Sequence, residues 1–142
     1  MLNRPATKEL QDFYLEQLCP KCDELLRFCF ALCLSLQDAR NLTAHTFSIA
    51  LEKLPEIMKS QHPMLALLSI AWDNLKSEPE RQDDMLPPII STLLALKREE
   101  RLAVMLIDIM GLREKECCSL TGWNAETVIK HAGAGRQKIL AV

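Results

Sequence analysis

Glycine is scarce in this sequence of 142 residues, which contains only four, and no segment alternates apolar and polar residues over the length of a β-strand. The residues that dominate instead, Leu, Ala, Glu, Lys and Met, are strong helix formers. No run approaches the roughly 18 consecutive apolar residues that a membrane-spanning helix needs, and 25% of the residues are charged. These features predict an all-α globular protein and argue against a membrane protein and a disordered chain.

An excess of positive charge is also absent. The sequence has 17 Lys and Arg residues against 19 Asp and Glu residues, which gives a net charge of −2. Because a strong nucleic-acid-binding protein usually carries a basic surface, any contact with DNA must be local or assisted by a partner. Residues 1–6 lack an apolar core followed by a small-residue cleavage site, so we expect no signal peptide and a cytoplasmic protein.

Apolar residues recur at helical spacing through most of the chain. We expect helices at about residues 8–34, 37–54, 63–76, 89–96, 102–110 and 113–120, and a last helix from about 125. Pro20 should kink or divide the first of these, and Pro55 should end the second. Ser35, three residues before Asp38, is typical of a helix cap.

A polar segment divides the chain. Residues 77–84 contain no apolar side chain, a composition typical of a linker. The sequence therefore predicts two small helical domains, at 1–77 and 86–142, joined by an acidic linker at 78–85.

The C-terminal part has the order of helix, glycine-bearing turn, helix. Gly111 should end the nearly all-buried helix at 102–110, and Thr121 and Gly122 should form the turn between the last two helices. This order is typical of a helix-turn-helix motif, whose second helix enters the major groove of DNA.

Six cysteines occur, and four of them lie near the N-terminus, at Cys19, Cys22, Cys29 and Cys33. Cys19 and Cys22 form a C-x-x-C pair, and four thiolates can bind zinc or undergo redox chemistry. Their spacing is not that of a standard zinc finger, and the last three share a predicted helix face with leucines. We therefore favour packing in the core over a metal site, and expect no cofactor. One of Cys117 and Cys118 should also point inward.

Two longer segments resemble a known family. Residues 38–54, DARNLTAHTFSIALEKL, are similar to the core-binding helix of bacterial RNA polymerase sigma factors, which reads approximately DAEDLVQETFxxALxKL. The segment from Arg101 through Gly111 and Gly122 to Val128 resembles the C-terminal sigma domain, with matching spacing. Two helical domains of this size resemble the small extracytoplasmic-function class. The resemblance covers about residues 9–140.

The resemblance implies two binding domains. The first would bind the RNA polymerase core and melt the −10 promoter element, and the second would place its last helix in the major groove of the −35 element. The polymerase-facing residues would be Asp38, Arg40, Asn41, Leu42, His45, Phe47 and Leu51. The −10-facing residues would be Trp72, Asn74 and Lys76. The DNA-facing residues of the last helix would be Asn124, Thr127, Lys130, His131, Arg136 and Lys138.

The tryptophans and histidines have distinct expected positions. Trp72 stands in the promoter-melting segment, where an exposed indole could stack on an unpaired base; burial against the linker or the second domain is the alternative. Trp123 follows the turn at an apolar position, and we expect it in the core. His45 and His131 should lie at the surface or in an interface, without a catalytic partner.

Departures from the family pattern leave three functions open. Arg40 and Asn41 replace an acidic pair, and His131 and Ala134 replace two arginine-type positions. The favoured function is promoter-directed transcription initiation through RNA polymerase. The second is a sigma-like regulator that binds an anti-sigma protein or the polymerase without reading promoter DNA, and the third is an unrelated helical metal or redox sensor. No phosphate-binding glycine loop, catalytic carboxylate pair or cofactor fingerprint occurs, so we do not expect an enzyme.

Overall fold

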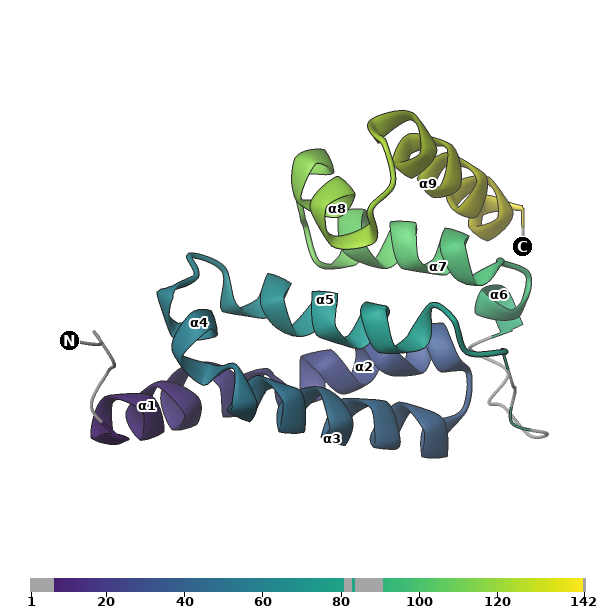
Figure 1. Ribbon diagram of the computed structural model, residues 1–142. Coiled ribbons are helices and arrows are strands. Elements are labelled where there is room, and N and C mark those ends of the chain that lie inside the picture. The colour runs from purple at the N-terminus through teal and green to yellow at the C-terminus, as the bar shows by residue number, and fades with distance from the viewer. Residues whose placement is uncertain (1–6, 81–82, 84–90, 142) are drawn as a thin grey trace.

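The computed structural model describes residues 7–80, 83 and 91–141 (Figure 1). These residues form helices and connecting turns and no β-strand, so the all-α prediction is confirmed. Half of the predicted linker at 78–85, namely residues 81, 82, 84 and 85, lies outside the described residues, and so does the start of the helix expected at 89–96. Within the described ranges, none of the helices combines the length and apolar character that crossing a bilayer requires.

The helices follow the expected order. The N-terminal half, residues 7–80, contains α1 (Thr7–Phe13), a π-helical turn (Tyr14–Leu18), a 3₁₀ turn (Cys19–Lys21), α2 (Cys22–Cys33), α3 (Leu36–Glu52), α4 (Leu54–Lys59) and α5 (Pro63–Leu75). The C-terminal half, residues 91–141, contains α6 (Ser91–Leu94), α7 (Arg98–Val104), a π-helical segment (Met105–Ile109), α8 (Glu114–Thr121) and α9 (Ala125–Leu140). Pro20 lies in the 3₁₀ turn that divides the first predicted helix, as expected.

Several helix starts and ends lie at the residues that the sequence predicts. The Ser35 hydroxyl accepts a hydrogen bond of 3.3 Å from the N–H of Asp38, which is the predicted cap of α3. Gly111 and Gly122 have φ angles of +70° and +78°, in the left-handed region that glycine adopts without strain. Leu34 also has a positive φ, 54°, at the end of α2.

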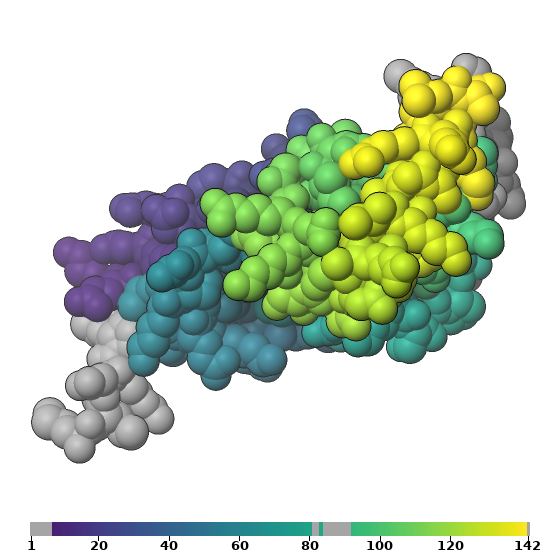
Figure 2. All heavy atoms as spheres, turned by 90° about the horizontal axis from the view of Figure 1, so that it is seen from above, coloured from purple at the N-terminus to yellow at the C-terminus, as the bar shows by residue number. Residues whose placement is uncertain are grey.

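The two halves pack together around one hydrophobic core. In Figure 1, α7, α8 and α9 lie on one side of α5, and α3 lies on the other side. Seen from above, the C-terminal half covers much of the middle of the N-terminal half (Figure 2). The buried cluster is continuous across this boundary, because it includes Phe28, Leu32, Leu67, Leu68, Trp72, Leu102, Leu106, Leu120 and Val128.

Several expectations about individual positions are wrong. Ile109, expected within a nearly all-buried helix, is 65% exposed at the end of the π-helical segment. Cys22 is exposed because it begins α2, one turn before the first buried residue of that helix. Pro55 does not end α3; it lies in the first turn of α4.

Candidate functional site

The predicted DNA-facing helix, α9, begins at a polar cap. The side-chain oxygen of Asn124 accepts a hydrogen bond of 2.8 Å from the N–H of Thr127. This bond satisfies one of the unpaired amides at the start of the helix, so the Asn124 oxygen already has a structural role. Thr127 is half-buried, and Lys130 is exposed one turn further on.

Two of the basic side chains on α9 are held by acidic side chains of the same half. Arg136 donates through Nε and Nη2 to the two carboxylate oxygens of Asp108, at 2.8 and 2.7 Å. Lys138 donates through Nζ to Glu100 at 2.6 Å. The hydrogen bond from Arg136 holds the pKa of Asp108 below its ordinary value, although burial acts in the other direction. In the described part of the chain, Lys130 forms no such ion pair.

The outward face of α9 is partly apolar. Ile129 and Leu140 are 57% and 84% exposed, and a Cβ atom added to Gly133 would meet no atom within 4 Å. These three positions share one stripe along the helix, beside the face that carries the buried residues Val128, Ala132 and Gly135. This surface was not predicted, although the spacing of Ile129, Gly133 and Leu140 is a visible signal.

Trp72, predicted to face the −10 element, lies instead between the two halves. It is 4% exposed, and its ring packs edge-on against Trp123, with centroids 6.2 Å apart. The Trp123 ring in turn contacts His131 of α9 at 4.9 Å. His62 and Glu116 lie 3.6 Å apart across the same α5–α8 contact. The burial alternative for Trp72 is therefore confirmed, and in this arrangement Trp72 does not offer a surface for stacking a base.

The other two predicted −10-facing residues point in different directions. Asn74 donates to the carbonyl of Ile70 at 2.8 Å and is half-buried. Lys76 is exposed and forms a surface ion pair of 3.3 Å with Asp73. Together with the buried Trp72, these side chains do not form one surface.

A buried arginine, Arg101, joins α7 to the end of α2. Its side chain is 1% exposed and donates to the carbonyls of Ala31, Leu32 and Leu96 at 2.6, 3.0 and 2.7 Å, and it also pairs with Glu80. The C-terminal carbonyls of a helix lack partners within that helix and carry partial negative charge. Arg101 satisfies two of them at once, and nothing in the local sequence indicated this contact.

A second arginine of α7 acts on the end of α5. Arg98 is 9% exposed and donates through Nη1 to the carbonyl of Glu78 at 2.7 Å and, at 3.5 Å, to that of Leu75. The two arginines therefore hold the C-terminal half against the ends of two helices of the N-terminal half.

The predicted polymerase-facing helix, α3, keeps an uncovered outer side. Arg40, Asn41, His45 and Leu51 are exposed there. Leu42 is buried, and Phe47 is half-buried and packs edge-on against Tyr14. Of the seven predicted residues, four are thus available to a partner, whereas Leu42 and Phe47 mainly pack.

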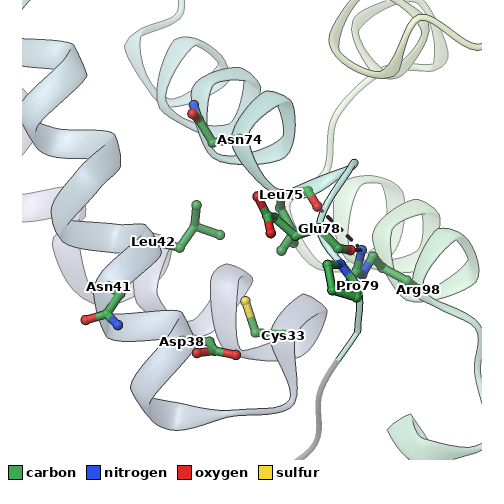
Figure 3. Close-up of a pocket in the computed structure, with 9 residues that line it drawn as sticks. All are labelled: Cys33, Asp38, Asn41, Leu42, Asn74, Leu75, Glu78, Pro79 and Arg98. Carbon is green, nitrogen blue, oxygen red and sulfur yellow. Dashed lines mark hydrogen bonds between the residues drawn. The ribbon is translucent and has the colours of Figure 1, made fainter.

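A cavity of about 480 Å³ lies between α3, α5 and the start of α7 (Figure 3). Its lining includes Asp38, Asn41 and Asn74, and the thiol of Cys33 points toward it. Burial raises the pKa of Cys33 to about 11, so that thiol stays protonated near neutral pH.

The four N-terminal cysteines do not come together as one site. Cys29 and Cys33 are buried, Cys19 is half-buried and Cys22 is exposed. No group of three or more His, Cys, Asp or Glu side chains in the described ranges is placed to hold a metal ion. The prediction that one of the later pair points inward is confirmed, because Cys117 is buried, whereas Cys118 is only half-buried.

Comparison with known proteins gives similarity of fold alone. No protein-family model matches the chain, and a search of curated proteins finds no match. Among solved structures, the chain is similar to the sigma factor RpoE of Bartonella quintana, solved in complex with the anti-sigma factor NepR. The TM-score is 0.76 and the identity 16%, with 92% of this chain and 96% of that chain covered. The chain therefore has a sigma-factor-like fold.

Proposed function

We propose that this chain is a sigma-factor-like regulator of transcription that binds a protein partner of the anti-sigma kind and does not read promoter DNA in the arrangement described here. The proposal rests mainly on the ion pairs and the exposed apolar side chains of α9. Arg136 and Lys138 are engaged by Asp108 and Glu100, and the outward face of the helix presents Ile129 and Leu140. Affinity for DNA depends mainly on cations that neutralise phosphates, whereas exposed apolar side chains favour contact with protein.

The outer side of α3 is accessible to a partner, whereas the surface predicted to contact the −10 element is not. Trp72 is buried between the halves, while α3 remains uncovered on the far side of the N-terminal half. Arg40 and His45 stand there in place of acidic family residues. This change of charge opposes binding to a basic surface on polymerase and suits an acidic partner. The structural neighbour with the same fold was solved with an anti-sigma factor, which supports a partner of that kind.

Promoter-directed initiation through RNA polymerase is the second candidate. It is favoured by the order of α8, the turn at Gly122 and α9, and by the exposed Lys130 near the start of α9. In this function the two halves would have to separate to expose Trp72, and the ion pairs of Arg136 and Lys138, which lie within the C-terminal half, would also have to open.

The two candidates are separated by capture and transcription experiments. Tagged full-length protein is purified from its own cells, and the co-purifying proteins are identified and tested for direct binding with recombinant partners. We expect a small regulatory protein whose binding is weakened by Arg40→Glu with His45→Glu and unchanged by Lys130→Glu. Capture of core RNA polymerase together with promoter-specific transcripts in vitro, abolished by Lys130→Glu, would overturn the proposal in favour of the second candidate.

A DNA-binding measurement tests the role of the ion pairs directly. Asp108→Asn with Glu100→Gln releases Arg136 and Lys138, so the double variant should bind duplex DNA more tightly than the parent chain. The slope of log affinity against log salt should steepen by up to about 2, one unit for each added phosphate contact. Equal affinity and equal slope in both proteins would show that these pairs do not suppress DNA binding.

A further inference from the structure

Cys19 and Cys22 form a thiol pair that neither the core nor the proposed function uses. Cys22 is exposed and Cys19 half-buried, whereas Cys29, Cys33 and Cys117 are buried. Burial raises the pKa of Cys29 to about 12 and the pKa values of Cys33 and Cys117 to about 11. Since the thiolate is the reactive form, the three buried thiols are both shielded and unreactive near neutral pH. Of the other three thiols, Cys118 is half-buried and its neighbour Cys117 is buried, so Cys19 and Cys22 are the cysteine pair that solution reaches.

The backbone that joins the pair is a closed turn. Cys19–Lys21 is a 3₁₀ turn, and the N–H of Cys22 donates to the carbonyl of Cys19. Both cysteines have helical dihedral angles, with φ −54° and ψ −41° at Cys19 and φ −58° and ψ −46° at Cys22. One such turn rises about 6 Å, within the Cα separation of roughly 4.4–6.8 Å that a disulfide spans. The two sulfurs can therefore be joined without a large backbone movement.

The position of Cys22 identifies the thiol that reacts first. It is the first residue of α2, a helix of 12 residues. Cys22 is also the more exposed member of the pair, so an oxidant in solution reaches it before Cys19.

We propose that Cys19 and Cys22 are a redox-active dithiol that glutathione disulfide, or another small disulfide, converts to an intramolecular disulfide beside Tyr14. The Cys22 thiolate attacks one sulfur of glutathione disulfide, which forms a mixed disulfide and releases one glutathione thiolate that takes up a proton. The Cys19 thiolate then attacks the Cys22 sulfur and releases the second glutathione, which is protonated in turn. The protein loses two electrons and two protons, and the glutathione disulfide gains both.

Tyr14 connects this pair to α3. Burial is the largest cause of the raised pKa of Tyr14, and its interactions with Cys19 and Cys22 raise that pKa further. The Tyr14 ring lies edge-on to Phe47 of α3, with centroids 6.3 Å apart. Because a disulfide carries no negative charge, closing the pair should lower the pKa of Tyr14. Tyr14 is the single tyrosine of the chain, so the ultraviolet absorbance of its phenolate reports this change directly.

The test uses the reduced full-length protein, equilibrated with mixtures of glutathione and glutathione disulfide, alkylated and mapped by peptide mass. We expect the oxidised chain to lose two hydrogens, Cys19 and Cys22 to escape alkylation together, and the pKa of Tyr14 to fall, with circular dichroism used to verify that the fold persists. Cys118→Ser removes a half-buried thiol outside the pair and should leave all three results unchanged. Cys22→Ser should abolish them.

Three results would overturn the proposal, and none depends on the identity of a protein partner. They are a mixed disulfide at Cys22 that never closes, disulfide-linked dimers in place of the internal disulfide, and a closed pair that leaves the pKa of Tyr14 unchanged.

Discussion

Replacing Arg101 with methionine should destabilise the fold strongly, although the new side chain is apolar and of similar length. Arg101 donates to the carbonyls of Ala31, Leu32 and Leu96, and its side chain is 1% exposed. Each hydrogen bond from a charged donor contributes about 1.5–3 kcal/mol, and a buried acceptor left without a partner loses a similar amount. Since nearby polar groups and water recover part of this, we expect a loss of about 3–5 kcal/mol, the usual effect of breaking a buried charged contact.

A loss of that size is large against the 5–15 kcal/mol that typically stabilises a domain. Urea unfolding followed by circular dichroism measures it, and with a slope near 2 kcal/mol per molar the midpoint should fall by about 2 M. Arg40→Met is the matched control, because Arg40 is exposed on α3 and its loss should change stability by no more than about 0.5 kcal/mol. The reasoning fails if the Arg101 variant loses less than about 1 kcal/mol or behaves like the control.

Two further predictions concern α9 and its contacts. Gly133→Ala should raise the free energy of unfolding by about 0.5–1 kcal/mol, because alanine favours the helix and its Cβ would meet nothing within 4 Å. Gly135→Ala should lower the free energy of unfolding, because its Cβ would lie 2.7 Å from Cγ2 of Val104. Equal thermal midpoints for the two variants would contradict this. The stabilisation from Asp108, whose pKa is lowered by Arg136, should be present above the carboxyl's unfolded pKa and be lost as pH falls through the folded value. Asp108→Asn should therefore flatten the acid side of stability against pH, and an unchanged curve would exclude the pair as its cause.

Features set by neighbouring residues could be predicted from the sequence. Helical spacing located the main helices, the residue pair Ser35 and Asp38 located the start of α3, and Gly111 and Gly122 located two helix ends. These signals depend on backbone conformation and on contacts within one or two turns, which a sequence displays directly. Even the division of the first helix at Pro20 follows from the geometry of a single ring.

Features set by distant residues could not be predicted. Arg101 is buried because it donates to carbonyls at the end of α2, about 70 positions earlier in the chain. No pattern in the residues around Arg101 indicates that this arginine is buried. The exposure of Ile129 was not predicted, because only the packing of the neighbouring helices shows which side of a helix is covered. Arg136 is held in an ion pair by Asp108, which lies 28 positions away in the sequence.

The shared core also bears on which function the fold favours. The resemblance implies two domains that contact separate promoter elements, so the first would have to expose Trp72, which here packs against Trp123 of the second. Separating them would remove the hydrogen bonds of Arg101 to Ala31 and Leu32 and expose Trp72, whose burial contributes several kcal/mol on the scale of large core side chains. A partner that binds the outer side of α3 requires neither change. We therefore expect such a partner to bind the closed chain, and promoter DNA to compete only where another protein supplies the energy of opening.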